Sequence, residues 1–193
     1  MPYGGDVDHG RAILGASTVG AVVLAVGLGV AITPGGALST EALGGGVCGT
    51  YPDDATAASA WFLTSFRNDT GRGVRVRDVR AVDVHRVTLS HLAIATSPRA
   101  DSPGLIVTTK PDLPRQYGPT VPVDSGFVVP AHGELDVVGR IVLRDGADAG
   151  RVHGLVATTV GPLGTIRTVT DPESFGVGIG EGHDESDIGC TGA

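Results

Sequence analysis

The chain has 193 residues, enough for one domain with additional segments, and a formal net charge of −7. Charged residues make up 18% of the sequence and there are two cysteines, which excludes a strongly basic nucleic-acid-binding protein and a disulfide-dense miniprotein. Six of the 21 acids follow the last basic residue, Arg167. The body of the chain is therefore nearly neutral, has no long-range attraction for nucleic acid, and is followed by an acidic segment.

An apolar segment of 21 residues without charge extends from Ala12 to Ile32. As a helix it would be about 31 Å long, which matches the hydrocarbon core of a bilayer. We therefore expect a transmembrane helix at 12–33 after a cytoplasmic tail at 1–11. A cleaved signal peptide is the alternative, because residues 37–39 (Ala-Leu-Ser) fit a cleavage site, but its apolar core is usually shorter.

The charges that flank this segment indicate its orientation. Arg11 precedes it, and the next basic residue after it is Arg67. The positive-inside rule then places the N-terminus inside the cytoplasmic membrane and the C-terminal domain outside; after signal-peptide cleavage the protein would instead be secreted. Small residues recur every four positions, a pattern that lets a partner helix, from another membrane protein or a second copy, pack closely, although it is also common in any Gly- and Ala-rich helix. These residues are Ser17, Ala21, Ala25 and Gly29.

The two cysteines, Cys48 and Cys190, bracket almost everything that follows the apolar segment. Outside the cytosol such a pair is oxidised readily. We expect a disulfide that closes a loop of about 142 residues and contributes about 4–5 kcal/mol in the chain-entropy model. Two free thiols are the alternative, and the absence of a Cys-x-x-Cys motif gives no support to a zinc site.

The body of the chain has the two-residue periodicity of β-strands. In 134–144, Leu135, Val137, Gly139, Ile141 and Leu143 alternate with a second set that includes Asp136 and Arg140. Further strands are expected at 60–67, 74–79, 87–96, 105–109, 127–129, 152–160 and 165–170. Four prolines exclude a central strand at 111–122. We expect a Gly- and Pro-rich linker at 34–56, an all-β, Ig-like antiparallel sandwich of seven to eight strands at 57–178, and an acidic Gly-rich tail at 179–193.

An anchor, a linker and one sandwich, in that order, resemble the single-pass exported envelope proteins of high-GC Gram-positive bacteria, which carry an Ig-like or fibronectin-like domain. Thirteen of the 14 basic residues are arginine, which is typical of high-GC genomes. The resemblance covers the whole chain by architecture and implies an interaction or accessory role. It includes no specific motif, so it transfers no functional residue to this sequence.

Candidate metal ligands occur in two places. The first is the acidic tail, where converging carboxylates would suit a cation but where a solvated tail is the more ordinary interpretation. Its candidates are Glu181, His183, Asp184, Glu185 and Asp187. The second is Asp83, His85 and His91, which would share one face of an unbroken strand. We expect no metal centre and no cofactor.

Other motifs give little support to catalysis. Residues 44–49 match G-x-G-x-x-G, but they follow no expected strand and open no expected helix. Arg75 and Arg77 alternate with valines, as in an anion-binding stripe or, more commonly, in the solvated face of a strand. Asn68-Asp69-Thr70 has the form of a glycosylation sequon, which the bacterial composition argues against. The G-x-S-x-G and H-E-x-x-H motifs do not occur.

These observations predict a membrane-anchored, non-catalytic accessory or interaction subunit of a cell-envelope complex. The first alternative is an extracytoplasmic module that binds a cation or a small ligand through the acidic tail or the segment 111–122. The second alternative is an enzyme whose site is assembled from dispersed Ser, His and Asp residues, since such sites are recognised in space rather than in sequence.

Overall fold

The computed structural model describes residues 38–40, 45–96, 105–109, 118–161 and 164–180. The chain divides into two compact units, Met1–Gly35 and Gly36–Ala193, and every described residue belongs to the second. The expected transmembrane helix, with Ser17, Ala21, Ala25 and Gly29, lies outside the described residues, as does the acidic tail after residue 180. Within the described ranges, no helix is long and apolar enough to cross a bilayer.

The described part of the chain is all-β, as the periodicity predicted. Its ten strands, in chain order, are β1 (Gly46–Tyr51), β2 (Ser59–Arg67), β3 (Val74–His85), β4 (Val87–Ala95), β5 (Leu105–Thr108), β6 (Thr120–Pro122), β7 (Val128–Val129), β8 (Glu134–Leu143), β9 (Ala149–Val160) and β10 (Ile166–Ile179). Each strand expected from the sequence is present, and β1 and β6 are additional. The short β6 is an edge strand, which agrees with the exclusion of a central strand there.

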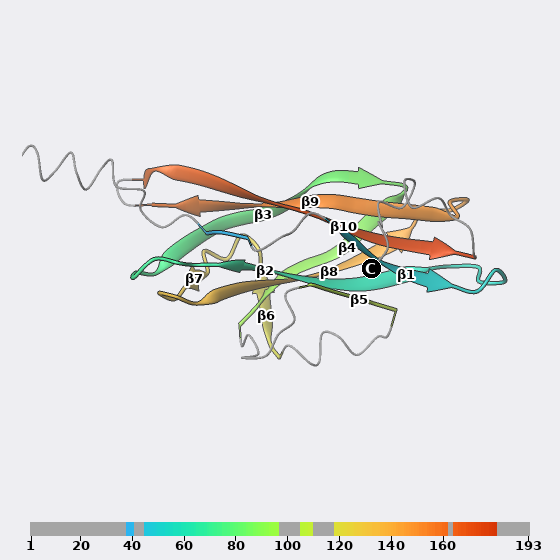
Figure 1. Ribbon diagram of the computed structural model, residues 1–193, viewed down its shortest axis with the longest axis horizontal. Coiled ribbons are helices and arrows are strands. Elements are labelled where there is room, and N and C mark those ends of the chain that lie inside the picture. Colours follow the sequence, from blue (N-terminus) through green and yellow to red (C-terminus); the bar gives the residue numbers. More distant parts are fainter. Residues whose placement is uncertain (1–37, 41–44, 97–104, 110–117, 162–163, 181–193) are drawn as a thin grey trace, which may run out of the picture. The chain divides into compact units, whose positions relative to one another are not determined.

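The strands form two layers, each a five-stranded sheet (Figure 1). Sheet A has the order β5-β2-β8-β4-β6, and sheet B has the order β1-β10-β9-β3-β7. Neighbouring strands are antiparallel except β1 and β10, which are parallel, with Gly46 opposite Ser174 and Tyr51 opposite Ile179. The prediction of a wholly antiparallel arrangement was therefore wrong at β1. Residues 46–51 also belong to the segment that was expected to be a linker. This strand was not predicted, because its glycines interrupt the alternation that marks the other strands.

The larger of two hydrophobic clusters among the described residues lies between the two sheets. Leu135, Val137 and Ile141 are fully buried, which confirms the inner face predicted for β8. Gly139 lies on the same face, and the ring of Phe62 from β2 occupies the space that a side chain at this position would need. That ring stacks on Phe175 of sheet B, with the centroids 4.3 Å apart. The missing side chain at position 139 thus makes room for an aromatic pair that joins the two sheets.

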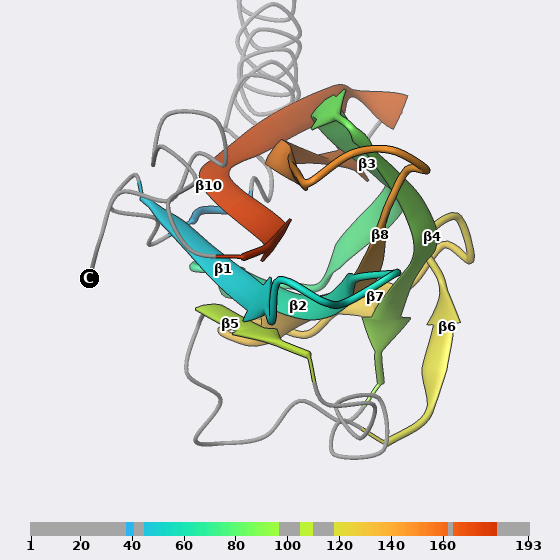
Figure 2. The ribbon, with the colours of Figure 1, turned by 90° about the vertical axis from the view of Figure 1, so that its right-hand side faces the viewer.

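One edge of the sandwich is closed by β1 and β5, which belong to different sheets and lie side by side (Figure 2). A Cβ atom on Gly49 would lie 3.0 Å from Cγ2 of Thr109 and 3.5 Å from Cβ of Ala60. These separations leave no room for a larger residue without a shift of its neighbours. Gly49 therefore allows the first strand to close against the opposite sheet.

The chain crosses from sheet B to sheet A through one residue, Arg86, which has a φ of 54°. Its carbonyl oxygen accepts a hydrogen bond from the amide of Arg144 at 3.0 Å. A left-handed backbone at an arginine is uncommon and is held here by the strands on both sides. As a consequence, β3 and β4 follow each other in sequence but lie in different layers.

Strand β10 is much longer than the strand expected at 165–170. It passes through a bulge between Asp171 and Ser174, opposite Gly154 of β9. Pro172 lies within this bulge, where a residue without an amide hydrogen is tolerated. The bulge allows the strand to continue to Ile179.

Candidate functional site

The exposed large hydrophobic side chains of the described residues all lie on sheet B; they are Val82, Val84, Val128 and Ile166. Val128, Arg75, Val160 and Ile166 are successive cross-strand partners over β7, β3, β9 and β10. Direct cross-strand partners project to the same side of a sheet. Since Val74 and Val76 are buried in the core, this row points away from it.

A second row on the same outer side, Asp78, Thr158 and Thr168, lies next to the first. A third row consists of Arg80, Val156 and Thr170, of which Val156 is buried. Val82, two residues beyond Arg80, is 59% exposed. We call this surface the sheet B face, and it consists of Arg75, Asp78, Arg80, Val82, Val128, Thr158, Val160, Ile166, Thr168 and Thr170. It combines apolar groups with two guanidinium groups and the half-buried carboxylate of Asp78 between them, and apolar groups together with arginine are typical of protein interfaces.

The predicted stripe of Arg75 and Arg77 is modified by a bulge in β3. The register shifts between Val76 and Asp78, so that Arg77 is the additional residue. Both arginines are exposed. Arg75, however, belongs to the row on the sheet B face, and its counterpart in the next row is Asp78 rather than Arg77.

The sandwich has an entry end, which we define by Leu38–Ser39 and the turns 67–73 and 130–133. Asn68, fully buried, organises it. The Asn68 side-chain amide donates to the carbonyl oxygens of Arg72 at 2.8 Å and Pro130 at 2.7 Å, and its Oδ1 accepts from the Thr70 hydroxyl at 2.6 Å. A side chain that is buried and fully hydrogen-bonded is unavailable for glycosylation, so the sequon at 68–70 is structural.

The chain joins the sandwich at the entry end. Leu38 is buried in the core, and Ser39 exchanges backbone hydrogen bonds with Arg67 at 2.7 and 2.8 Å. Nε of Arg67 lies 2.9 Å from Oδ1 of Asp69, in an ion pair whose side chains are about half exposed. Residues 38 and 39 were expected in the linker but are fixed to the domain, so any linker ends before Leu38.

Asp171 is a carboxyl group buried between the two sheets. Its Oδ2 accepts a hydrogen bond from the Thr64 hydroxyl of sheet A at 2.6 Å, and its Oδ1 accepts one from the Glu173 amide at 3.1 Å. Burial raises the pKa of Asp171, while these hydrogen bonds and the nearby His153 partly offset the increase. This polar bridge was not predicted, because nothing near Asp171 in the sequence marks it as an inward-facing residue.

Asp136 is a second buried carboxyl group, on the outer side of sheet A. The Ser65 hydroxyl donates to its Oδ1 at 2.5 Å, whereas Oδ2 is buried without a hydrogen-bond partner. Burial raises the pKa of Asp136, the hydrogen bond from Ser65 lowers it, and the charge of Glu134 raises it. The sequence placed Asp136 on the polar face of β8. That side of the strand is nevertheless closed to solvent here, since the neighbouring Val138 is also fully buried.

The two buried carboxyl groups predict a specific pH dependence of stability. Because their folded-state pKa values are raised by burial, the folded chain binds these protons more tightly than the unfolded chain. The free energy of unfolding should therefore increase as the pH falls from neutral toward the ordinary carboxyl pKa. In denaturant titrations across this range, the free energy of unfolding should change less with pH in the double variant Asp136→Asn/Asp171→Asn than in the wild-type protein. An identical slope in the variant would contradict the prediction.

The hydroxyl of Thr64 provides a second test of the buried bridge. Thr64→Val removes the donor to Asp171 and should lower the free energy of unfolding by about 1–3 kcal/mol, because a buried acceptor loses its partner. Thr64→Ser keeps the hydroxyl and is the matched control. Equal losses in the two variants, measured by chemical denaturation, would show that the hydrogen bond is not the cause.

Ser174 and His153 are the serine and histidine that the fold brings together. His153 Nδ1 and Ser174 Oγ are 2.7 Å apart, on paired positions of β9 and β10. Ser174 is only 4% exposed, however, and Asp171 is engaged in the core with Thr64. A nucleophile must reach its substrate, so this pair does not form a usable catalytic site.

Trp61, Arg140 and His91 form a row on the outer side of sheet A. Arg140 pairs with Trp61 on one side and with His91 on the other. Its guanidinium lies 5.8 Å from the centre of the Trp61 ring, and its terminal nitrogen donates to Ser59 Oγ at 3.1 Å. His91 contacts the same ring edge-on. The cation–π and hydrogen-bond contacts satisfy Arg140 within the sheet.

The histidine candidates for a metal do not converge. Asp83 and His85 are on β3 of sheet B, whereas His91 is on β4 of sheet A, because Arg86 breaks the strand between them. The condition under which these residues would share one face, an unbroken strand, is therefore not met. In the described part of the chain, no group of three or more His, Cys, Asp or Glu residues is arranged to hold a metal. The tail candidates Glu181, His183, Asp184, Glu185 and Asp187 lie outside that part.

Cys48 is half-buried on β1, opposite Gly176 of β10, and is not a free thiol. Its expected partner, Cys190, lies outside the described residues, so the disulfide stays a prediction. The G-x-G-x-x-G match at 44–49 overlaps β1 from Gly46 onward. A phosphate-binding loop of this type must follow a strand and open a helix, so this one has the wrong local structure.

No protein-family model and no curated protein sequence matches this chain.

Proposed function

We propose that the protein is a membrane-anchored, extracytoplasmic interaction subunit of a cell-envelope complex, without catalytic activity of its own. The apolar segment at 12–32 supports the anchor, with the N-terminus inside and the sandwich outside, and cleavage with secretion is the alternative. The small-residue positions Ser17, Ala21, Ala25 and Gly29 would pack against a partner helix. A Cys48–Cys190 disulfide would fit that oxidising location.

We also propose an Ig-like classification for the fold. The order β2-β8-β4 in sheet A and β10-β9-β3 in sheet B matches the B-E-D and G-F-C orders of constant-type immunoglobulin sheets. Strands β5, β6 and β7 would then be insertions between the fourth and fifth strands of that pattern. Scaffolds of this kind serve many functions, so the classification alone assigns none.

The observation that carries the proposal is the sheet B face. Val128 and Ile166 are 47% and 56% exposed, and Arg75 lies in the same cross-strand row. A row that crosses four strands and combines exposed apolar groups with Arg75 is a poor surface for a free domain and a suitable one for a protein contact. The guanidinium groups of Arg75 and Arg80 favour a partner that presents carboxylates around an apolar centre.

The test is co-migration with the partner on native gels after gentle detergent extraction. Ile166→Glu and Arg80→Glu should each release the chain as a monomer. Ile166→Glu would bury an acid in the contact, and Arg80→Glu would place a negative charge against an acidic partner surface. Thr88→Glu, an exposed position on β4 of sheet A, is the matched control and should leave the complex intact.

Three results would contradict the proposal. The first is a wild-type chain that runs as a monomer in every detergent, and the second is a complex that survives both sheet B variants. A complex with the mass of two copies would replace the heterologous partner with self-association. Unchanged thermal unfolding of each variant is required, since surface substitutions of this kind rarely alter stability by more than about 0.5 kcal/mol.

A further inference from the structure

We propose that the outer side of sheet B, next to β1, is the docking site for the acidic segment 181–193 of this same chain. The site is centred on two positions of β10, Gly176 and Gly178, which we call the glycine strip. This inference rests on the Cys48–Cys190 disulfide of the proposed function. It concerns the opposite end of β10 from Ile166 and the sheet B face, and its occupant belongs to the chain itself.

The glycine strip is directed away from the hydrophobic core. Phe175 and Val177 are fully buried in the core, and successive positions of a strand alternate between its two sides. Gly176 and Gly178 are therefore on the outer side of sheet B. Cys48 of β1 is the cross-strand partner of Gly176, and direct partners share one side of a sheet. The side chain of Cys48 thus borders the strip.

The glycine strip is buried although it faces outward. Gly176 and Gly178 are both buried, and Ala149, the partner of Gly178 on β9, is only 5% exposed. Glycine has no side chain that could cover a neighbouring residue, and the second sheet of the sandwich lies on the inner side. The cover must therefore come from a part of the chain outside the ten strands, in close contact with the backbone of β10.

The segment 181–193 begins at the strip and would be brought back to it by the disulfide. Gly180 follows β10 directly, and its amide donates to the carbonyl oxygen of Tyr51 at 2.8 Å. Tyr51 and Cys48 are separated by about 10 Å along β1. The chain from Gly180 to Cys190 could extend to about 33 Å. A segment of that length, held at both ends, would fold back beside β1 and over the strip.

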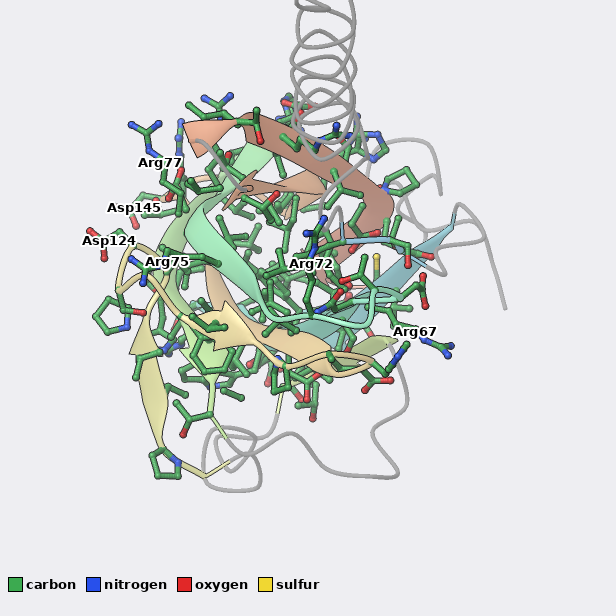
Figure 3. The ribbon with its side chains drawn as sticks, turned by 90° about the vertical axis from the view of Figure 1, so that its left-hand side faces the viewer. Arg67, Arg72, Arg75, Arg77, Asp124 and Asp145 are labelled. Atoms are coloured by element: carbon green, nitrogen blue, oxygen red, sulfur yellow. The ribbon has the colours of Figure 1, made fainter. Side chains whose placement is uncertain are left out.

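The charges around the strip indicate where the carboxylates of the segment would lie. Arg151, half-buried on β9, is the cross-strand partner of Gly176 and borders the strip. Arg75 and Arg77 are at the other end of sheet B, where Figure 3 shows them projecting from β3. The row through the strip contains no acid; it consists of Cys48, Gly176, Arg151 and His85.

Exposed acids lie around the strip rather than in this row. Asp53 and Asp54 follow β1, and Asp83 is on β3, two strands away from β10. Carboxylates of the segment 181–193 would be repelled from these positions and attracted to Arg151. The charge pattern therefore favours docking along the β9 side of the strip.

The experiment measures amide hydrogen exchange in residues 182–189 of the full-length, oxidised chain. The reference is a synthetic peptide with the sequence of residues 181–193. A disulfide alone would fix only Cys190 and leave the other amides open to solvent. Docking on the glycine strip should slow their exchange by about tenfold or more relative to the peptide.

Variants of the strip and of its border test the site itself. Gly176→Val/Gly178→Val fills the strip with side chains that strands accept, and it should return the exchange to within about twofold of the peptide rate. Arg151→Gln removes the bordering charge and should accelerate the exchange by about twofold to fivefold. Thr88→Val, an exposed position on β4 of sheet A, is the matched control and should leave the exchange unchanged. Thermal unfolding verifies that each variant is folded.

Exchange at the peptide rate in the wild-type chain would overturn the proposal, and so would protection that survives in Gly176→Val/Gly178→Val or is unaltered in Arg151→Gln. Protection that appears only after addition of Ca²⁺ would assign the segment to cation binding, which also overturns it. Thiol counting on the unfolded, unreduced chain tests the disulfide separately. Two reactive thiols contradict the disulfide of the proposed function, whereas a disulfide without protected amides contradicts only the docking.

Discussion

Gly139→Ala should lower the free energy of unfolding by about 3 kcal/mol, the upper part of the range for overpacked cores. The added Cβ would overlap the ring of Phe62, which is fully buried and stacked on Phe175. The ring cannot move aside without disturbing the contact that joins the two sheets. Chemical denaturation can be followed by the fluorescence of Trp61, the single tryptophan of the chain.

Gly71→Ala is the matched control for this variant. A Cβ on Gly71 would meet no atom within 4 Å, and the residue lies in the exposed part of the turn 67–73. This substitution should be neutral or stabilise the domain by a few tenths of a kcal/mol, because it restricts the unfolded chain. Similar losses in the two variants would show that the space above Gly139 is not what requires glycine there.

Breaking the proposed Cys48–Cys190 disulfide should lower the free energy of unfolding by about 4 kcal/mol, because a loop of about 142 residues regains its freedom in the unfolded chain. The comparison is between the oxidised protein, the reduced protein and Cys48→Ser/Cys190→Ser, each unfolded by denaturant. The reduced protein and the double variant should agree. Cys48 pairs with Gly176 in the register of β1 and β10, so the cross-link would also hold the edge of sheet B.

Thiol counting on the unfolded, unreduced protein decides whether the premise is correct. Two reactive thiols would exclude the disulfide, and the stability difference should then be absent. Addition of reductant to the double variant is the internal control and should change nothing.

The sequence predicted the strands well where one face of a sheet meets the core. In β8 the alternation of Leu135, Val137, Gly139 and Ile141 identified the inner face, because burial on one side imposes a period of two. The reason for glycine at position 139 could not be predicted, because Phe62, whose ring occupies the space of a side chain there, is distant in sequence. The change of sheet at Arg86 could not be predicted either, because periodicity marks a strand without indicating which sheet it joins.

The candidate surfaces were predicted only in part. Arg75 was singled out by its alternation with valines, but its direct cross-strand partners, Val128 and Val160, come from β7 and β9. Such a row depends on register between strands that lie far apart in the chain, which local sequence does not encode. The buried Asp136 and Asp171 were missed for a related reason: their partners, Ser65 and Thr64, are on another strand.

The parallel pairing of β1 with β10 determines when the domain can be completed during synthesis. Gly46, near the start of the sandwich, can pair with Ser174 only after Ser174 has been synthesised, and Tyr51 depends on Ile179 in the same way. A chain that emerges N-terminus first cannot finish sheet B until nearly all of it has been made, and pairings of such long range form slowly. For a protein exported as proposed, the newly made chain would remain unfolded enough to pass through a narrow channel until its last strand has passed, and sheet B would close only on the other side.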